Sequence, residues 1–445
     1  MSGNARGMAQ HMRTLSRIAV AVAATLALSS MAAPLPIDPK SIVTPRPASG
    51  TSAKTIDRAI AALDAGDLAG AEAAFREAIR LDPKAPGGYI GLAEVAARRN
   101  QAAQVESWLK KALEVAPDSV ETLRVWGRYQ SQQGRFADAE ATLKKAVAAA
   151  PDNVDVRLEL GEVQLLGLKN PRAAEQTFRG ALERNPTHVG ARIALAKALA
   201  AQGRADEAVA AFEQAAKAAP RDPEPLLALA RYQASRAQVD ASLATLDRLI
   251  AAVPSAAQAY LDRGDLLLLK NDVPKAMDSY RALVKAVPEQ AAIGHYRLAA
   301  LYEAQQQWAQ AEQSYRAAIK ADPKFVAAYN NLAFMLANRG QKLDEAQRLA
   351  ERAVELAPQV PTTLDTLGWV HRAQGNLEAA AKALDRAIAA QPRNPVFHYH
   401  LGIVRSDQGR KAEARKSLER ALEIDPKFRG ADDARQRLEK LKAAR

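Results

Sequence analysis

A proline recurs every 34 or 35 residues over most of the chain, and this regularity constrains the fold more than any other feature of the sequence. The eleven prolines are Pro83, Pro117, Pro151, Pro186, Pro220, Pro254, Pro288, Pro323, Pro358, Pro392 and Pro426. Proline lacks the backbone donor that a helix needs and disfavours helix in the residue before it, so each proline marks the end of a structural unit. A period of this length is typical of repeat proteins. We therefore expect one array, although a length of 445 residues would ordinarily suggest about three domains.

Each unit carries two apolar patterns with helical spacing. Alanine stands twelve residues before nearly every proline, as Ala174 does, and a large apolar residue such as Phe178 follows four residues later. Earlier in the unit, apolar or small residues follow one another at intervals of three, one and three, which places them on one helical face. Leu364, Leu367 and Gly368 are an example, and the small residue lets another helix approach closely. The pattern predicts two short antiparallel helices in each unit.

This pattern resembles the tetratricopeptide repeat (TPR) family, whose signature is W-x2-L-G-x2-Y, then A-x3-F, then P. The resemblance covers residues 52–428 as eleven repeats in unbroken register. It implies an all-α fold, a right-handed superhelical solenoid of helix-turn-helix repeats that is stabilised by stacking of neighbours. One-residue insertions near 167–171, 291–295 and 341–343 are expected in turns. Residues 429–445 are predicted to form a charged helix that caps the last repeat.

The amino end has the three parts of a secretory signal peptide over residues 1–32. Arg13 and Arg17 precede an apolar run over residues 18–28, and small residues suited to cleavage end the segment. The run is too short to cross a bilayer as a helix, although an uncleaved anchor is the alternative. Residues 33–51 contain five prolines and are predicted to be an extended linker. We therefore expect the repeats in the periplasm of a Gram-negative cell, membrane-associated only if the signal stays uncleaved.

No residue pattern indicates catalysis or a metal site. The chain has no Cys, which excludes disulfides, thiolate zinc sites and lipid attachment through cysteine. His398 and His400 are two residues apart, so on a helix they point about 200° apart and cannot share a metal. His371 stands at an inward position and is expected to be packed. Phosphate-binding loops and nucleophile motifs are absent from the sequence, and we predict a protein that is not an enzyme and uses no cofactor.

The charge pattern argues against nucleic acid and lipid as partners. The net charge is +12, but Lys and Arg alternate with Asp and Glu along every repeat, as they do on solvated helix faces. No basic block with interleaved aromatic residues is present. Membrane contact is expected only through partners or through an uncleaved signal.

In the TPR family, one face of the first helix of each repeat lines a concave groove where peptides bind. The ninth residue of each unit lies on that face, and it is apolar or aromatic in the last three repeats. The predicted groove residues are Asn330, Asn331, Phe334, Asn338, Asp365, Trp369, Arg372, Tyr399, His400 and Ile403. Aromatic residues flanked by Asn and Arg are typical of interaction hot spots. The alternative is that Phe334 and Trp369 pack between adjacent helices and line no groove.

A charged set in the earlier repeats is a second candidate site. It comprises Arg124, Arg128, Glu159, Glu162 and Lys197, with ordinary surface charge as the alternative. Two specialised sites of the family, a carboxylate clamp and an asparagine ladder, are not supplied by this sequence.

The resemblance implies a non-catalytic scaffold that holds protein partners in the groove. Residues 364–369 (LDTLGW) and 398–401 (HYHL) look like the carboxyl-terminal part of TPR proteins linked to exopolysaccharide and exosortase (PEP-CTERM) systems. The alternative function is a recruiting or regulatory subunit of a cell-envelope enzyme complex, such as one for exopolysaccharide synthesis and export or for protein sorting.

Overall fold

The computed structural model describes residues 51–443, and this part of the chain is helical with no strand. The predicted signal peptide and residues 33–50 of the predicted linker lie outside the described residues. The α-helices are α3 (Thr51–Asp64), α4 (Leu68–Leu81), α5 (Gly87–Arg98), α6 (Ala102–Val115), α7 (Val120–Gln132), α8 (Phe136–Ala149), α9 (Val154–Glu162), α10 (Pro171–Arg184), α11 (Val189–Ala201), α12 (Ala205–Ala218), α13 (Glu224–Ser235), α14 (Val239–Ala252), α15 (Ala257–Leu269), α16 (Val273–Ala286), α17 (Ala291–Ala304), α18 (Trp308–Ala321), α19 (Val326–Asn338), α20 (Leu343–Leu356), α21 (Pro361–Ala373), α22 (Leu377–Ala390), α23 (Pro395–Asp407), α24 (Lys411–Ile424) and α25 (Ala431–Ala443). A π-helix, η1 (Val163–Gly167), and a 3-10 helix, η2 (Pro288–Gln290), complete the set. The all-α helix-turn-helix fold expected from the sequence is confirmed.

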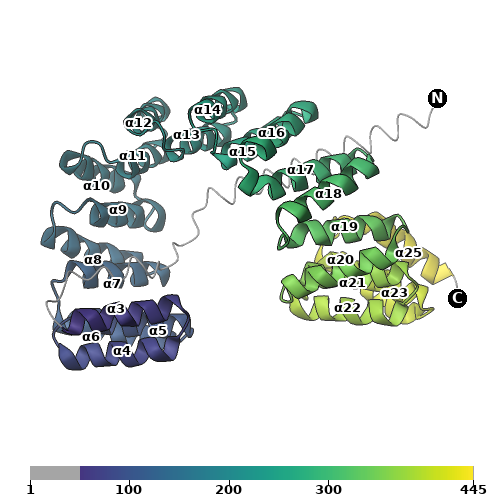
Figure 1. Cartoon of the computed structure of the whole chain (residues 1–445), viewed down its shortest axis with the longest axis horizontal. Helices are drawn as coiled ribbons and strands as arrows, with labels where there is room; N and C mark the ends of the chain where they lie inside the picture. Colours follow the sequence, from purple (N-terminus) through teal and green to yellow (C-terminus); the bar gives the residue numbers. More distant parts are fainter. Residues whose placement is uncertain (1–50, 444–445) are drawn as a thin grey trace. The chain divides into compact units, whose positions relative to one another are not determined.

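The described residues divide into two compact units, and the boundary in the sequence lies between Val253 and Pro254. Within each unit the helices pack in chain order, and the two helices of a repeat lie against each other (Figure 1). The second helix of a repeat also packs against the first helix of the next, as α4 does against α5 and α22 against α23. Within each unit, neighbouring repeats therefore bury their apolar faces against one another.

Close approach of the two helices in a repeat depends on the small residue of the first helix. Phe178 of α10 is completely buried, and a Cβ added at Gly161 of α9 would lie 2.2 Å from its ring. Likewise, a Cβ added at Gly264 of α15 would lie 2.4 Å from the ring of Tyr280 in α16. The role expected for the small residue, to admit a neighbouring helix, is confirmed at these positions.

The prediction that the three insertions fall in turns is wrong for two of them. The first is absorbed inside a helix, because α9 continues as η1 and Leu168 donates to the carbonyl of Val163, five residues back. The second insertion, near residues 291–295, lies within the first turns of α17, directly after η2. Only the third lies in a turn, where Lys342 adopts a left-handed conformation with φ 49°.

Helix α25 covers the end of the last repeat. Ala431, Ala434 and Leu438 of α25 are buried and pack with Leu418 and Ala421 of α24. The opposite side of α25 carries exposed charged residues, so the apolar stacking surface ends there.

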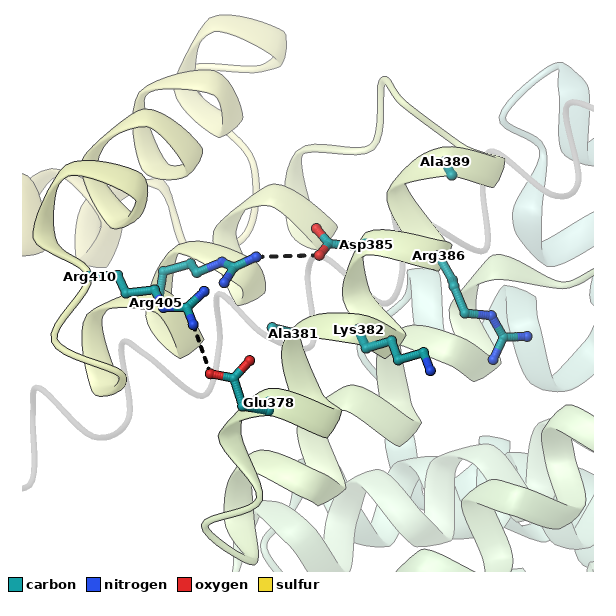
Figure 2. Close-up of a pocket in the computed structure, with 8 residues that line it drawn as sticks. All are labelled: Glu378, Ala381, Lys382, Asp385, Arg386, Ala389, Arg405 and Arg410. Carbon is teal, nitrogen blue, oxygen red and sulfur yellow. Dashed lines mark hydrogen bonds and ion pairs between the residues drawn. The ribbon is translucent and has the colours of Figure 1, made fainter.

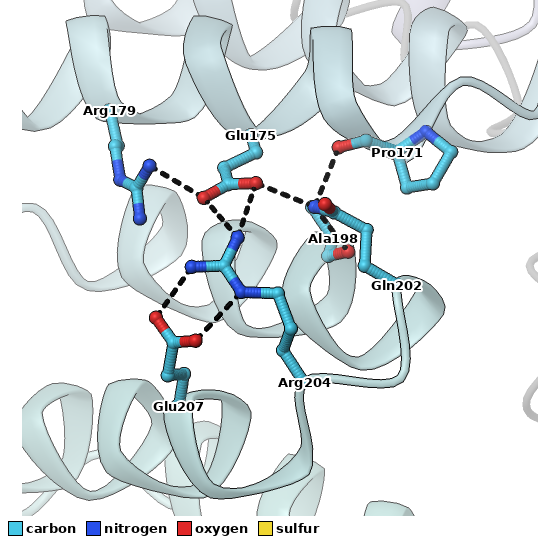
Figure 3. A network of polar contacts seen from close by, with 7 residues as sticks. All are labelled: Pro171, Glu175, Arg179, Ala198, Gln202, Arg204 and Glu207. Atoms are coloured by element: carbon cyan, nitrogen blue, oxygen red, sulfur yellow. Dashed lines mark hydrogen bonds and ion pairs between the residues drawn. The ribbon is translucent and has the colours of Figure 1, made fainter.

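Polar groups also join consecutive repeats, and Glu175 of α10 is the best-connected example (Figure 3). Its carboxylate is buried and accepts hydrogen bonds from Gln202 at 2.6 Å and Arg204 at 2.7 Å, both of the following repeat. It also forms an ion pair with Arg179 at 2.6 Å. Burial alone would raise the pKa of Glu175, but the hydrogen bonds from Gln202 and Arg204 outweigh it and the pKa lies below its ordinary value. Arg204 also pairs with Glu207 at 2.6 Å.

The substitution Glu175→Gln is expected to destabilise the junction of these repeats by about 1–2 kcal/mol at pH 7, since it removes a buried charge partner of two guanidinium groups. A lowered pKa means that the stabilisation is present above the ordinary pKa of Glu and is lost as pH falls through the folded-state pKa. Hydrogen exchange of α10–α12 measured at pH 7 and below pH 4 checks this. A difference between variant and wild type that persists at low pH contradicts it.

Candidate functional site

Aromatic rings from three successive first helices lie against one another at the carboxyl-terminal end. The ring of Trp369 (α21) is 6.3 Å from that of Phe334 (α19) and 4.4 Å from that of His400 (α23), between centroids. Tyr399 continues the series at 5.6 Å from His400. We call these four residues the aromatic face. Phe334, Trp369 and Tyr399 are partly exposed, whereas His400 is buried.

Polar side chains one repeat away hold two of these rings in place. The indole Nε1 of Trp369 donates to Oδ1 of Asn338 in α19 at 2.6 Å. Nδ1 of His400 lies 2.8 Å from Oδ1 of Asp365 in α21, and both residues are 7% exposed. Because each bond joins two repeats, the orientation of the rings is fixed by the stacking of the array.

Arg372 of α21 completes the surroundings of the indole. Its guanidinium carbon lies 4.7 Å from the centre of the Trp369 ring, a distance suited to a cation–π interaction. Its Nε donates to Oδ2 of Asp407 in α23 at 2.6 Å. The positive charge is thus balanced, and the surface around Trp369 is amphipathic rather than strongly charged.

Asn330 and Asn331 lie at the α17 side of the aromatic face. Nδ2 of Asn331 donates to the hydroxyl of Tyr296 in α17 at 3.0 Å, and Nδ2 of Asn330 donates to Oδ1 of Asn331 at 3.2 Å. Burial raises the pKa of Tyr296, so this hydroxyl stays protonated. Oδ1 of Asn330 is buried and has no hydrogen-bond partner among the described residues.

Two predicted groove residues have mainly structural contacts. The hydroxyl of Tyr399 donates to Oδ2 of Asp433 in α25 at 2.7 Å, and burial together with this bond raises the pKa of Tyr399 to about 12. Ile403 is 2% exposed and belongs to the packed interior. Tyr399 therefore ties the aromatic face to the capping helix, and Ile403 offers almost no surface to a partner.

The two interpretations of Phe334 and Trp369 are not exclusive in the structure. Both rings pack between successive first helices, as the alternative stated, and both keep part of their surface exposed. The sequence analysis missed Tyr296, Asp407 and Asp433, each of which bonds to a predicted site residue. The repeat period is the signal that finds them, because these bonds join residues 34 or 35 positions apart.

The charged candidate in the earlier unit forms an ion triplet between α7 and α9. Arg124 and Arg128 both donate to Oε1 of Glu159, at 2.6 and 2.5 Å, and the side chains of the three residues are 15–23% exposed. Glu162 is also half-buried, and burial raises its pKa, whereas Lys197 is exposed. The triplet is therefore partly desolvated rather than an ordinary set of surface charges.

Next to this triplet, burial raises the pKa of Glu121 to about 7, from an ordinary value of 4.5. A raised pKa favours the folded state while the group is protonated, so stability is expected to fall by about 2–3 kcal/mol as pH rises from about 4.5 to about 7. The substitution Glu121→Gln should abolish this fall. Hydrogen exchange of α7 between about pH 4 and about pH 8 measures this loss of stability. An equal fall in the variant would refute the assignment to Glu121.

Within residues 51–443, no three His, Asp or Glu side chains are arranged to hold a metal ion. His398 contacts the carbonyl of Pro392 at 2.9 Å and His400 contacts Asp365, so the two rings have separate partners. Across the same range, no helix combines the length and apolar character needed to cross a membrane.

Stacked helix pairs whose small and large packing positions recur from repeat to repeat define the class of helical repeat proteins. Within that class the chain belongs to the tetratricopeptide repeat family. Family models described as tetratricopeptide repeat match residues 62–124, 131–167, 165–232, 227–291, 292–325, 325–393 and 366–427.

Individual relatives are distant. A TPR repeat-containing protein of Pseudomonas aeruginosa is 29% identical over 123 residues, which are 28% of this chain. The chain spans about a fifth of the length of that curated relative, 21%. Among solved structures, yeast Tom70 is 16% identical with a TM-score of 0.42, and 88% of this chain and 96% of that chain are covered. A tetratricopeptide repeat protein of Parabacteroides merdae is 20% identical with a TM-score of 0.41, covering 53% of this chain and 93% of that one.

Proposed function

We propose that this protein is a scaffold whose aromatic face binds an extended segment of a partner protein. The TPR fold is typically non-catalytic and presents extended surfaces to protein partners. The observation that carries the proposal is the stack of Phe334 and Trp369, held by bonds to neighbouring repeats yet partly exposed. A preorganised aromatic surface loses little side-chain entropy when a partner binds.

The surface chemistry favours a partner segment with apolar side chains. Arg372 is paired with Asp407, so its guanidinium does not present an unpaired charge beside the indole. Apolar side chains would contact the exposed parts of Phe334 and Trp369.

The finer proposal places the protein in the periplasm, within exopolysaccharide or exosortase-linked machinery. It is supported by the signal-peptide pattern of residues 1–32 and by the resemblance of residues 364–369 and 398–401. Cell fractionation with amino-terminal sequencing of the mature chain tests export, since cleavage is expected after Ala32. Detection of the intact amino end in the cytoplasm would overturn it.

In-cell crosslinking followed by mass spectrometry tests the scaffold proposal. The comparison strain carries Phe334→Ala and Trp369→Ala, and a matched control carries Trp308→Ala, which removes a partly exposed indole from α18 in the same unit. A partner lost only in the first variant supports the proposal. If the same partners were captured in all three strains, the aromatic face would not be the binding site, and the charged set of α7 and α9 would be the next candidate.

The second candidate function is a recruiting subunit of an enzyme complex, which differs in that the partner's rate depends on this chain. An activity that co-purifies with the wild type, and falls with the Phe334→Ala, Trp369→Ala variant, distinguishes recruitment from passive scaffolding.

A further inference from the structure

A hollow of about 430 Å³ lies beside α22, at the corner between α23 and α24 (Figure 2). Ala381 of α22 is one of the residues that line it, and four cationic side chains surround it. They are Lys382, Arg386, Arg405 and Arg410. We refer to this site as the α22 hollow, and it does not include the aromatic face.

Comparison of the repeats in register shows that the α22 hollow lacks a carboxylate that several other repeats have at the position corresponding to Ala381. Ala381 stands eleven residues before Pro392, and Glu175 stands eleven residues before Pro186, so the two occupy equivalent positions. The same position carries glutamate in four further repeats, at Glu72, Glu106, Glu140 and Glu312. The α22 repeat therefore carries a methyl group at a position where five other repeats carry a carboxylate.

The donors that serve this carboxylate are retained. Gln202 and Arg204, which bond to Glu175, correspond by register to Gln408 and Arg410. Without a carboxylate at position 381, both donors instead reach Glu378, Gln408 at 3.0 Å and Arg410 at 2.9 Å. The side chain of Glu378 is 75% exposed, so these contacts are weak surface interactions that another carboxylate can displace.

Arg405 of α23 adds a largely buried cation to the α22 hollow (Figure 2). Its side chain is only 14% exposed, and its nearest acidic groups are Asp385 at 3.4 Å and Glu413 at 3.3 Å. Both acidic side chains are more than half exposed. The guanidinium is thus largely desolvated and only loosely paired.

Lys382 and Arg386 lie one turn apart on α22 and are exposed. Among the described residues, neither has a carboxylate within ion-pair distance. The residues that line the α22 hollow include four cations and two carboxylates, Glu378 and Asp385, so the site has an excess of positive charge.

We propose that the α22 hollow binds a carboxylate side chain from an acidic segment of a partner protein, in the place that Glu175 fills in its own repeat. Arg410 and Gln408 would turn from Glu378 to this carboxylate, and Lys382 and Arg386 would attract further acidic residues beside it. The inference shares with the proposed function only the premise that the partner is a protein. The α22 hollow and the aromatic face are different surfaces.

The test is fluorescence anisotropy of the full chain with a fluorescein-labelled octapeptide of alternating Glu and Gly. Binding is expected at low salt, and the peptide with Gln in place of Glu should bind at least tenfold more weakly. The variant Lys382→Gln, Arg386→Gln should lose at least tenfold in affinity. The matched control is Arg348→Gln, Arg352→Gln, which changes the equivalent positions on α20, where Gln347 occupies the position of Ala381; this control should stay within twofold of wild type.

The substitution Ala381→Glu supplies the missing carboxylate from the chain itself. It should abolish peptide binding while circular dichroism shows unchanged helix. Wild-type affinity in this variant, or an equal loss in the α20 control, overturns the proposal. Tighter binding of polygalacturonate, a carboxylated polysaccharide, overturns the assignment to a protein partner. The variant Phe334→Ala, Trp369→Ala should bind the peptide normally, so failure of this site and failure of the aromatic face are separable.

Discussion

Replacing Phe334 and Trp369 by alanine is expected to weaken binding of the partner captured by crosslinking at least 30-fold. Truncation of an aromatic hot-spot residue typically costs about 2 kcal/mol or more, which is about 30-fold in affinity and sets the lower limit because such costs are not additive. Trp is among the commonest hot-spot residues. Here the indole is oriented by Asn338 and His400, so the bound geometry is present before binding. Surface plasmon resonance with the purified partner measures the change.

The control for this result is Trp308→Ala. That indole lies on α18 under the guanidinium of Arg339, 4.6 Å from its ring centre, and takes no part in the aromatic face. Affinity should remain within twofold. Equal loss in both variants would show that binding responds to general weakening of the repeats, and would contradict the assignment of the site.

Gly161→Ala is expected to destabilise the repeat formed by α9 and α10 by about 2 kcal/mol. The new Cβ would lie 2.2 Å from the completely buried ring of Phe178, which has no free space to enter. Overpacking of this kind costs about 1–3 kcal/mol and exceeds the gain of up to ~1 kcal/mol in helix propensity. Urea denaturation followed by circular dichroism, together with hydrogen exchange of α9 and α10, measures the loss.

Gly180→Ala in α10 is the matched control, because the same chemical change is made where there is room. The nearest atom to an added Cβ is Nη1 of Arg157, at 3.5 Å, which is an ordinary contact. This variant should be more stable than wild type by about 0.5–1 kcal/mol. Destabilisation by both substitutions would mean that loss of glycine, rather than the contact with Phe178, is responsible.

The repeat period predicted the fold because each packing contact recurs with it. Phe178 and Gly161 meet for the same reason as Tyr280 and Gly264, so a single rule on spacing describes both pairs. Contacts between unlike residues were not predicted. That Trp369 donates to Asn338, or that Tyr399 turns toward Asp433, depends on side-chain rotamers that hydrophobic spacing does not determine.

The insertion at η1 shows a second limit of the sequence pattern. An extra residue can lengthen a turn, or it can be accommodated in a helix as a π-helical segment, in which the N–H bonds to the carbonyl five residues back. Both outcomes leave the following repeat in register. The structure has the π-helical segment η1. The ring of Phe136 packs against Gly167, where an added Cβ would lie 2.3 Å from it. The choice depends on local packing against the preceding repeat, which the apolar spacing does not describe.

The bonds between successive first helices give the repeats a fixed order. The imidazole of His400 pairs with the carboxylate of Asp365, which stands one repeat earlier. The indole of Trp369 likewise donates to the amide oxygen of Asn338 in the preceding repeat. Deletion of the α21–α22 repeat would place His400 opposite Asn330, and Ile403 opposite Asn338. The modules of this array are therefore not interchangeable parts, and evolution by duplication or loss of whole units is restricted at this end of the chain although the backbone repeat itself would allow it.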